Sequence, residues 1–165
     1  MRSCLSRLFG SAVLALFLLL AALPAQAADL TFPKDRLTVQ TADKKEHAFE
    51  IELAVDADHR QQGLMNRRQM AADHGMLFDF GQTRRVMMWM KNTYLALDML
   101  FIAEDGRVEN IRENAVPLSE AIIDSGTPVA YVLELNAGTV RRLGIAAGDR
   151  VQTPHIANRA ENAGP

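Results

Sequence analysis

The chain has 165 residues, of which 48% are hydrophobic and 23% are charged, and its formal net charge is −2 at pH 7. This balance excludes a strongly basic nucleic-acid-binding protein and a highly charged disordered chain. The single cysteine, Cys4, excludes an intramolecular disulfide and a zinc site built from thiolates. The length indicates one globular domain that is stabilised by its core.

Residues 1–27 have the organisation of a secretory signal peptide. Arg2 and Arg7 are followed by an apolar run over residues 8–23, and small residues precede a cleavage position after Ala27. The apolar run has about 16 residues, fewer than the roughly 20 that a membrane-spanning helix needs, which favours cleavage over an anchor. We therefore expect a periplasmic or secreted protein.

The mature chain is expected to be acidic. Arg2 and Arg7 are the only ionisable side chains before residue 28 apart from Cys4, so removing them leaves 16 basic residues against 20 acidic ones. A net charge of −4 favours neither nucleic acid nor, after signal cleavage, a membrane as a partner. We expect a monomer whose partner is a small molecule or a component of the cell envelope.

The mature sequence opens with the pattern of a β-hairpin. Residues 28–47 read as a leader and a first strand over 37–41, and a second strand over 48–55 follows a turn at 42–45. Apolar residues alternate with acidic ones in the second strand, as is typical of a half-buried antiparallel strand.

One short helix and several strands are predicted after this hairpin. Asp56 and Asp58 offer N-cap oxygens to a helix through residues 59–62, and Gly63 suits its end. The later strands are predicted at residues 76–80, in the first half of 84–102 after a turn at 81–83, from Asp98 onward, at 107–113 after the Asp105-Gly106 hairpin turn, at 128–135, and after the turn at 145–151.

The remaining segments are loops and a second helix. Residues 114–127 read as a long connection that could border a site, and Asn136 is predicted to cap a helix that Gly144 ends. Residues 154–165 have the composition of a loose tail. Short strands, two short helices and no βαβ pattern predict an α+β, mostly β fold: a single small antiparallel β-barrel-like domain over 48–153.

Three ionisable residues lie inside runs that read as buried. Lys91 and Asp98 belong to the apolar stretch 84–102, and Glu134 lies between two leucines. A buried ion without a partner costs several kcal/mol, so we expect Lys91 to form a salt bridge with Asp98 or Glu134.

The sequence leaves several interpretations of this polar cluster open. The three charges could form a structural ion pair, they could belong to a ligand site, or Asp98 and Glu134 could act with Lys91 in a hydrolase. A ligand site would include Lys91, Asn92, Asp98, Glu134, Arg60 and Trp89. A further alternative is a Cu(I) site made of the thioethers of Met87, Met88 and Met90, although methionine is also a common core filler. No other metal and no cofactor is predicted.

Six ordered segments together resemble one protein family. They are R-Q-Q-G-L-M-N-R from Arg60, G-M-L-F-D-F from Gly75, W-M-K-N-T from Trp89, L-D-M-L-F-I from Leu97, Y-V-L-E-L-N-A-G from Tyr131 and G-I-A-A-G-D-R-V from Gly144. The segments resemble the uncharacterised prokaryotic family known as domain of unknown function number 192. Met88 and Ala96 depart from the aromatic residue and the proline that are usual in the family.

The resemblance implies a small β-rich barrel fold, often exported, with no agreed activity. It also marks Arg60, Lys91, Asn92, Asp98 and Glu134 as positions that match polar residues of the family. No oriented pair of nucleophile and base is recognisable in the sequence, so we expect a binding module rather than an enzyme.

Overall fold

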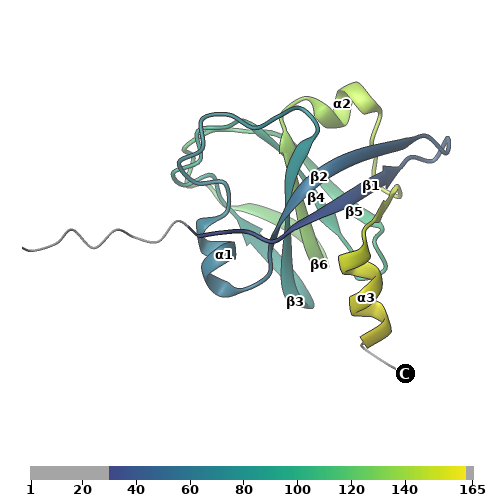
Figure 1. The fold of residues 1–165 in the computed structure, drawn as a ribbon. Coiled ribbons are helices and arrows are strands. Elements are labelled where there is room, and N and C mark those ends of the chain that lie inside the picture. The colour runs from purple at the N-terminus through teal and green to yellow at the C-terminus, as the bar shows by residue number, and fades with distance from the viewer. Residues whose placement is uncertain (1–29, 163–165) are drawn as a thin grey trace, which may run out of the picture.

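The computed structural model describes residues 30–162, so the predicted signal peptide lies outside the described residues. Seven strands and three short helices follow one another along the chain (Figure 1). They are β1 (Lys34–Gln40), β2 (Glu46–Ala54), α1 (Ala57–Gln62), β3 (His74–Met88), β4 (Leu97–Ile102), β5 (Val108–Ala115), β6 (Ile123–Asn136), α2 (Thr139–Leu143), β7 (Arg150–Gln152) and α3 (Pro154–Asn162). None of the helices within residues 30–162 has the length and apolar character to cross a membrane.

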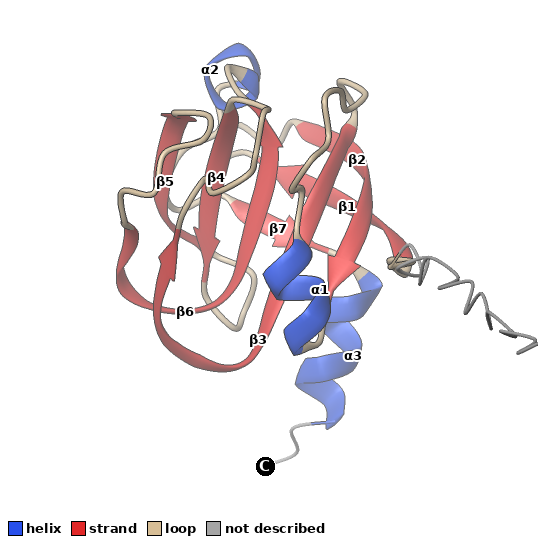
Figure 2. Ribbon diagram, turned by 90° about the vertical axis from the view of Figure 1, so that its left-hand side faces the viewer, coloured by secondary structure: helices blue, strands red, loops and turns tan. Residues whose placement is uncertain are grey.

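The seven strands form one sheet that curls into a half-barrel (Figure 2). Its strand order is β5-β4-β6-β3-β2-β1-β7. The two edges approach each other through backbone hydrogen bonds between residues 106–108 and 148–151, including 2.8 Å from the Val108 N–H to the Asp149 carbonyl. The prediction of a mostly β, barrel-like fold is confirmed.

Gly106 makes this close approach of the two edges possible. It follows Asp105 in the predicted hairpin turn between β4 and β5 and has a positive φ of 87°. A Cβ atom at this position would lie 2.4 Å from the Val151 carbonyl oxygen. Any side chain there would both strain the turn and separate β5 from β7.

The chain departs from a purely antiparallel sheet at one place. β1 and β2 form the predicted antiparallel hairpin, but β2 and β3 are parallel and are joined through α1, a βαβ connection that the sequence did not predict. The predicted helix itself is confirmed: the Asp56 carboxylate accepts a hydrogen bond of 2.9 Å from the His59 N–H, and Gly63 ends α1 with a φ of 45°.

Two strands are longer than predicted. β3 continues through the predicted turn at 81–83, with shifts of register between Asp79 and Arg84 and again before Met87. β6 begins at Ile123, inside the predicted connection 114–127. Irregular pairing of this kind bends long strands, and here it lets β3 and β6 follow the curl of the sheet.

The prediction of a loose tail is wrong for residues 154–162, which form α3. Thr153 donates a hydrogen bond of 2.6 Å to Asp35, and Ile156 is buried in the core. His155 and Arg159 both contact the Asp79 carboxylate, with 2.8 Å between His155 Nε2 and Asp79 Oδ2. Polar contacts attach this mainly polar helix to Asp35 and Asp79, which are distant in the chain. The local composition of residues 154–162 does not predict such contacts.

The sheet carries a hydrophobic cluster on each face. One cluster includes Leu77, Leu100 and Leu133, and the other includes Met76, Met99 and Val132. Neighbouring residues of each strand belong to opposite clusters because successive strand side chains point to opposite faces. The second cluster also contains Leu64, which follows α1, and Met90, from the loop between β3 and β4. These two segments surround the candidate site.

Candidate functional site

Glu134 on β6 is a buried carboxyl group with apolar neighbours. Its partners in the adjacent strands are Met76 on β3 and Met99 on β4, and both are fully buried. Glu134 itself is only 4% exposed. Among the described residues, its carboxyl group has no hydrogen-bond or ion-pair partner. Burial alone raises the pKa of Glu134 from 4.5 to about 8.

Glu134 lines a pocket of about 120 Å³ that opens beside α1. Arg60, Trp89 and Lys91 border the same pocket, so the structure brings together four of the six residues predicted to bind a ligand. The remaining lining residues are mostly apolar or uncharged: Gln61, Gln62, Gly63, Leu64, Met65, Phe78, Phe80, Met87, Met88 and Thr93.

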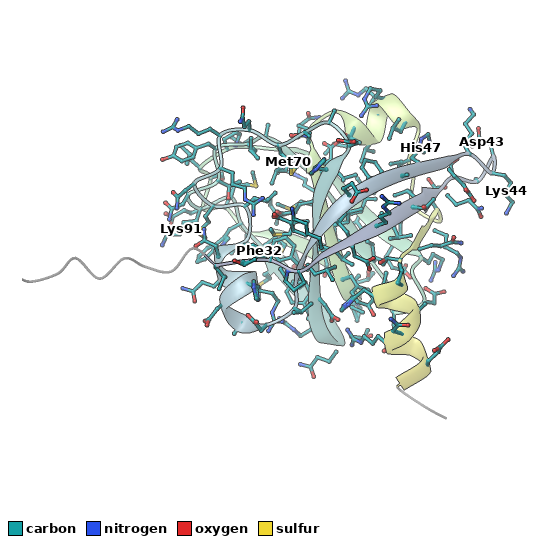
Figure 3. The ribbon with its side chains drawn as sticks, in the orientation of Figure 1. Phe32, Asp43, Lys44, His47, Met70 and Lys91 are labelled. Atoms are coloured by element: carbon teal, nitrogen blue, oxygen red, sulfur yellow. The ribbon has the colours of Figure 1, made fainter. Side chains whose placement is uncertain are left out.

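A second, shallower recess adjoins the pocket. It has a volume of about 490 Å³ and shares Trp89 and Lys91 with the pocket, together with three residues of the α1 region. Asn92, also predicted to bind a ligand, borders this recess and not the pocket. Figure 3 shows Lys91 at the edge of the molecule, on the side opposite the β1–β2 hairpin tip that carries Asp43 and Lys44. Pocket and recess together form a site with a deep end at Glu134 and an open end at Asn92.

The predicted salt bridge of Lys91 is wrong. Lys91 is half-buried, and among residues 30–162 no ion pair joins it to Asp98 or Glu134. Its ammonium nitrogen lies 5.3 Å from the centre of the Trp89 ring, within the range of a cation–π interaction. The apolar run around Lys91 suggested burial, but the chain leaves β3 at Met88 and turns outward, which lets the ammonium group stay hydrated.

Arg60 supports the wall of the pocket. Its guanidinium group donates hydrogen bonds of 2.7 Å to the Val55 carbonyl and 2.8 Å to the Asp79 carbonyl. It also lies 6.0 Å from the centre of the Phe80 ring. These contacts attach α1 to Val55, directly after β2, and to Asp79 within β3, so Arg60 holds the pocket in shape.

Asp98 lies outside the pocket, contrary to the predicted site. It pairs with Leu135 across β4 and β6, whereas Glu134 pairs with Met99, so the two carboxyl groups point to opposite faces of the sheet. The Asp98 carboxylate accepts hydrogen bonds of 2.9 Å from the N–H groups of Asn114 and Val140. It thereby provides a hydrogen-bond acceptor for a backbone N–H group in the first turn of α2.

The helix cap predicted at Asn136 is also wrong. The N-cap residue of α2 is Gly138, which provides no side-chain hydrogen bond, and the buried Asp98 carboxylate supplies the acceptor from β4. Asn136 instead donates to the carbonyls of Met70 and Ala71 at 3.2 and 3.0 Å. A residue distant in the chain has replaced the local cap that the sequence suggested.

The three methionines of the copper alternative do not share one environment. Met87 is 66% exposed, and it lines the pocket together with Met88. Met90 is fully buried in the second core cluster.

Several pocket residues were not predicted, and Phe78 and Phe80 are the main examples. They follow Met76 at intervals of two along β3, so all three point to the face on which Glu134 lies. The alternation was visible in the segment G-M-L-F-D-F, but the pairing of Met76 with Glu134 was not.

The family model for domain of unknown function 192 (DUF192), described as an uncharacterized ACR, matches residues 38–153. A crystal structure from Sinorhizobium meliloti 1021, provisionally named a transcription regulator, is 66% identical with a TM-score of 0.75, and the match covers 76% of this chain and 97% of that chain. A protein of unknown function from Novosphingobium aromaticivorans DSM 12444 is 36% identical with a TM-score of 0.72, and here the match covers 80% and 94%. No curated protein matches the chain. The chain belongs to the DUF192 family.

Proposed function

We propose that this protein is an exported, non-catalytic binding module of the cell envelope, and that it takes a small ligand into the pocket that ends at Glu134. The proposal combines two features: a preformed pocket on a rigid sheet, and a signal-like segment at residues 1–27.

The unpaired carboxyl group of Glu134 carries the proposal. Glu134 is 4% exposed and its carboxyl group has no protein partner within residues 30–162, so its burial costs free energy that water or a ligand in the pocket must offset. A methionine like its neighbours Met76 and Met99 would avoid this cost. A ligand that bonds to the carboxyl group explains why a glutamate stands beside the buried Phe78 and Leu64 in the lining of the pocket.

The rest of the pocket has the composition of a recognition site. Its lining combines aromatic rings and thioethers with polar side chains from α1, from the loop after β3 and from β6. The adjoining recess of about 490 Å³ offers room for the part of a ligand that does not enter. A small head group in the pocket and a larger body in the recess fit this shape.

A second candidate is a hydrolase that uses Glu134 as a general acid. The observation that favours it is the raised pKa of about 8, because a carboxyl group that keeps its proton at neutral pH can donate it to a leaving group. Binding remains the first candidate for two reasons. Asp98 faces away from the pocket, and Thr93 supplies the one hydroxyl group among the described lining residues.

A role in DNA binding is not proposed, although the Sinorhizobium relative is named as a regulator. The mature chain would have 16 basic residues against 20 acidic ones, and proteins that bind DNA neutralise phosphates with an excess of positive charge.

The binding function is tested with the purified mature protein. Thermal shifts are measured with envelope sugars, peptidoglycan fragments, amino acids and Cu(I), and the same mixtures are analysed for reaction products. We expect a stabilising shift without turnover, which Glu134→Gln abolishes. Turnover that Glu134→Gln abolishes would establish the hydrolase instead, and a shift with Cu(I) alone would move the site to the methionines.

A lysine variant outside the pocket serves as the control. Lys91 borders the pocket, whereas Lys44 lies at the tip of the β1–β2 hairpin on the other side of the molecule (Figure 3). A ligand of this pocket must respond to Glu134→Gln but not to Lys44→Met. Export is tested separately through the intact mass of the periplasmic protein, which should begin at Ala28.

A further inference from the structure

The aromatic and thioether part of the pocket lining is electron-rich, and the cationic side chains of the lining are Arg60 and Lys91. Glu134 closes the deep end of the pocket, and the rings of Phe78, Phe80 and Trp89 contribute to the walls together with the thioether of Met88. The faces of aromatic rings carry partial negative charge and attract cations, and thioether sulfur is a weak acceptor. No cationic side chain within residues 30–162 forms an ion pair with Glu134.

We infer that the ligand of this pocket carries a small organic cation, a primary ammonium group, which forms an ion pair with Glu134 at the base. The inference rests on the proposed binding function and names the chemical class of the ligand. A primary ammonium has three N–H donors, enough for the two oxygens of Glu134 and one further acceptor.

Lys91 shows that an ammonium group fits against this wall. Its nitrogen lies 5.3 Å from the centre of the Trp89 ring at the mouth of the pocket. The same ring borders both the pocket and the outer recess, so a ligand ammonium can enter past Trp89.

An anionic head group fits the base less well. The cations that line the pocket are Arg60 and Lys91, and the Arg60 guanidinium already donates to two backbone carbonyls. An anion would lie against Glu134 and the aromatic faces, so the positive charges of Arg60 and Lys91 would have to offset its repulsion from the Glu134 carboxylate.

The size of the pocket limits the head group. A volume of about 120 Å³ is smaller than the roughly 150 Å³ of a cavity that binds benzene, so the pocket admits a head group of only a few heavy atoms. An ammonium with a short alkyl chain fits this space, and a bulkier quaternary ammonium would fill it without donating a hydrogen bond to Glu134.

The protonation of Glu134 gives the inference a distinctive pH dependence. The charged residues that line the pocket with Glu134 are Arg60 from α1 and Lys91 from the loop after β3, and the Glu52–Arg67 ion pair lies on the same face beyond Met76. The pKa of Glu134 is about 8, so a cation that binds below pH 8 displaces a proton. Cation affinity should therefore rise up to about tenfold per pH unit between pH 6 and 8.

The test uses three probes of similar shape: n-butylammonium, 1-butanol and butyrate. Their binding is measured by NMR titration at pH 6, 7 and 8. We expect n-butylammonium to bind best, to bind more tightly as pH rises, and to weaken about tenfold or more in Glu134→Gln. Lys91→Met should increase its affinity, because it removes a like charge from the pocket lining, whereas Lys44→Met should have no effect.

Trp89→Leu provides a second variant that does not disturb the base of the pocket. Trp89 is 47% exposed, so its replacement should leave the fold intact and weaken n-butylammonium through loss of the cation–π contact.

The inference is overturned if butyrate or 1-butanol binds at least as well as n-butylammonium, or if Glu134→Gln leaves ammonium binding unchanged. In the first case the proposed binding function survives, provided that Glu134→Gln weakens the probe that binds best. In the second case ammonium binds outside the pocket, and the proposed function then depends on the compounds of the wider panel. If no probe and no compound of the wider panel binds, both the inference and the proposed function fail.

Discussion

Glu134 and Asp98 lie on the adjacent strands β6 and β4 but face opposite sides of the sheet. Asp98 pairs with Leu135 and Glu134 with Met99, one residue apart in register. The Asp98 carboxylate accepts hydrogen bonds from two backbone N–H groups. The Glu134 carboxyl group has no hydrogen-bond partner among the described residues. The sheet thus separates a structural carboxylate from one that is available to a ligand.

We expect Asp98→Ala to destabilise the protein without a direct effect on the pocket. The substitution leaves the N–H groups of Asn114 and Val140 without their acceptor. Hydrogen bonds to a charged acceptor contribute about 1.5–3 kcal/mol each, so the free energy of unfolding should fall by about 3 kcal/mol or more. Urea denaturation measures the loss, with the exposed Asp58→Ala as the control. A loss below about 1 kcal/mol would contradict a structural role for Asp98.

Glu134 should make the stability of the protein fall as pH rises. Below its unfolded pKa of 4.5 the carboxyl group is protonated in both states, and between 4.5 and about 8 only the folded state keeps the proton. Stability then decreases by up to about 1.4 kcal/mol per pH unit and levels off above pH 8.

The effect of Glu134 is isolated by comparison with Glu134→Gln, which cannot titrate. Urea denaturation of both proteins from pH 4.5 to 8.5 should show the variant gaining stability relative to the parent as pH rises. A difference that is independent of pH would mean that Glu134 is charged or solvated in the folded protein.

Gly106→Ala should be far more costly than the same change at a glycine in open space. At Gly106 the new Cβ would lie 2.4 Å from the Val151 carbonyl oxygen, whereas at Gly148 it would meet nothing within 4 Å. Both glycines have positive φ, 87° and 97°, so the backbone strain of about 1–3 kcal/mol is common to both variants. The additional loss in Gly106→Ala measures the clash between the sheet edges, and equal losses would show that the edges are not in contact.

Arg159→Met should loosen α3. Burial favours the protonated form of Asp79, but hydrogen bonds from His155 and the Gly81 N–H and the charge of Arg159 outweigh it, so the pKa of Asp79 is lowered below 3.8. Removal of Arg159 strips a largely buried carboxylate of its strongest counter-charge, and we expect a loss of about 2–3 kcal/mol.

Hydrogen exchange of the backbone amides of residues 154–162 measures the release of α3. The control is Arg141→Met, because Arg141 is largely exposed and lies 3.8 Å from Glu113. The parent protein should lose the same contribution as the pH falls below 3.8 through the folded pKa of Asp79. Unchanged exchange in Arg159→Met would show that Ile156 and the contacts of Thr153 and His155 hold the helix without Arg159.

Local signals in the sequence identified much of the fold. The alternation in residues 48–55, the N-cap at Asp56 and the Asp105-Gly106 turn predicted a strand, a helix and a hairpin that the structure confirms. These features depend on contacts between residues close in the chain, so their pattern is readable without the fold. The parallel pairing of β2 with β3 and the attachment of α3 depend on distant partners, and the sequence missed both.

The sequence by itself determined that Glu134 is buried, because its leucine neighbours mark a core strand. Only the tertiary structure decided which residues share a site with it. The side chains of a strand alternate between two faces, so a shift of one residue in the pairing of β4 and β6 would place Asp98 beside Glu134. The register is determined by the packing of the whole sheet. It places the Asp98 carboxylate at the first turn of α2 and Glu134 in the lining of the pocket.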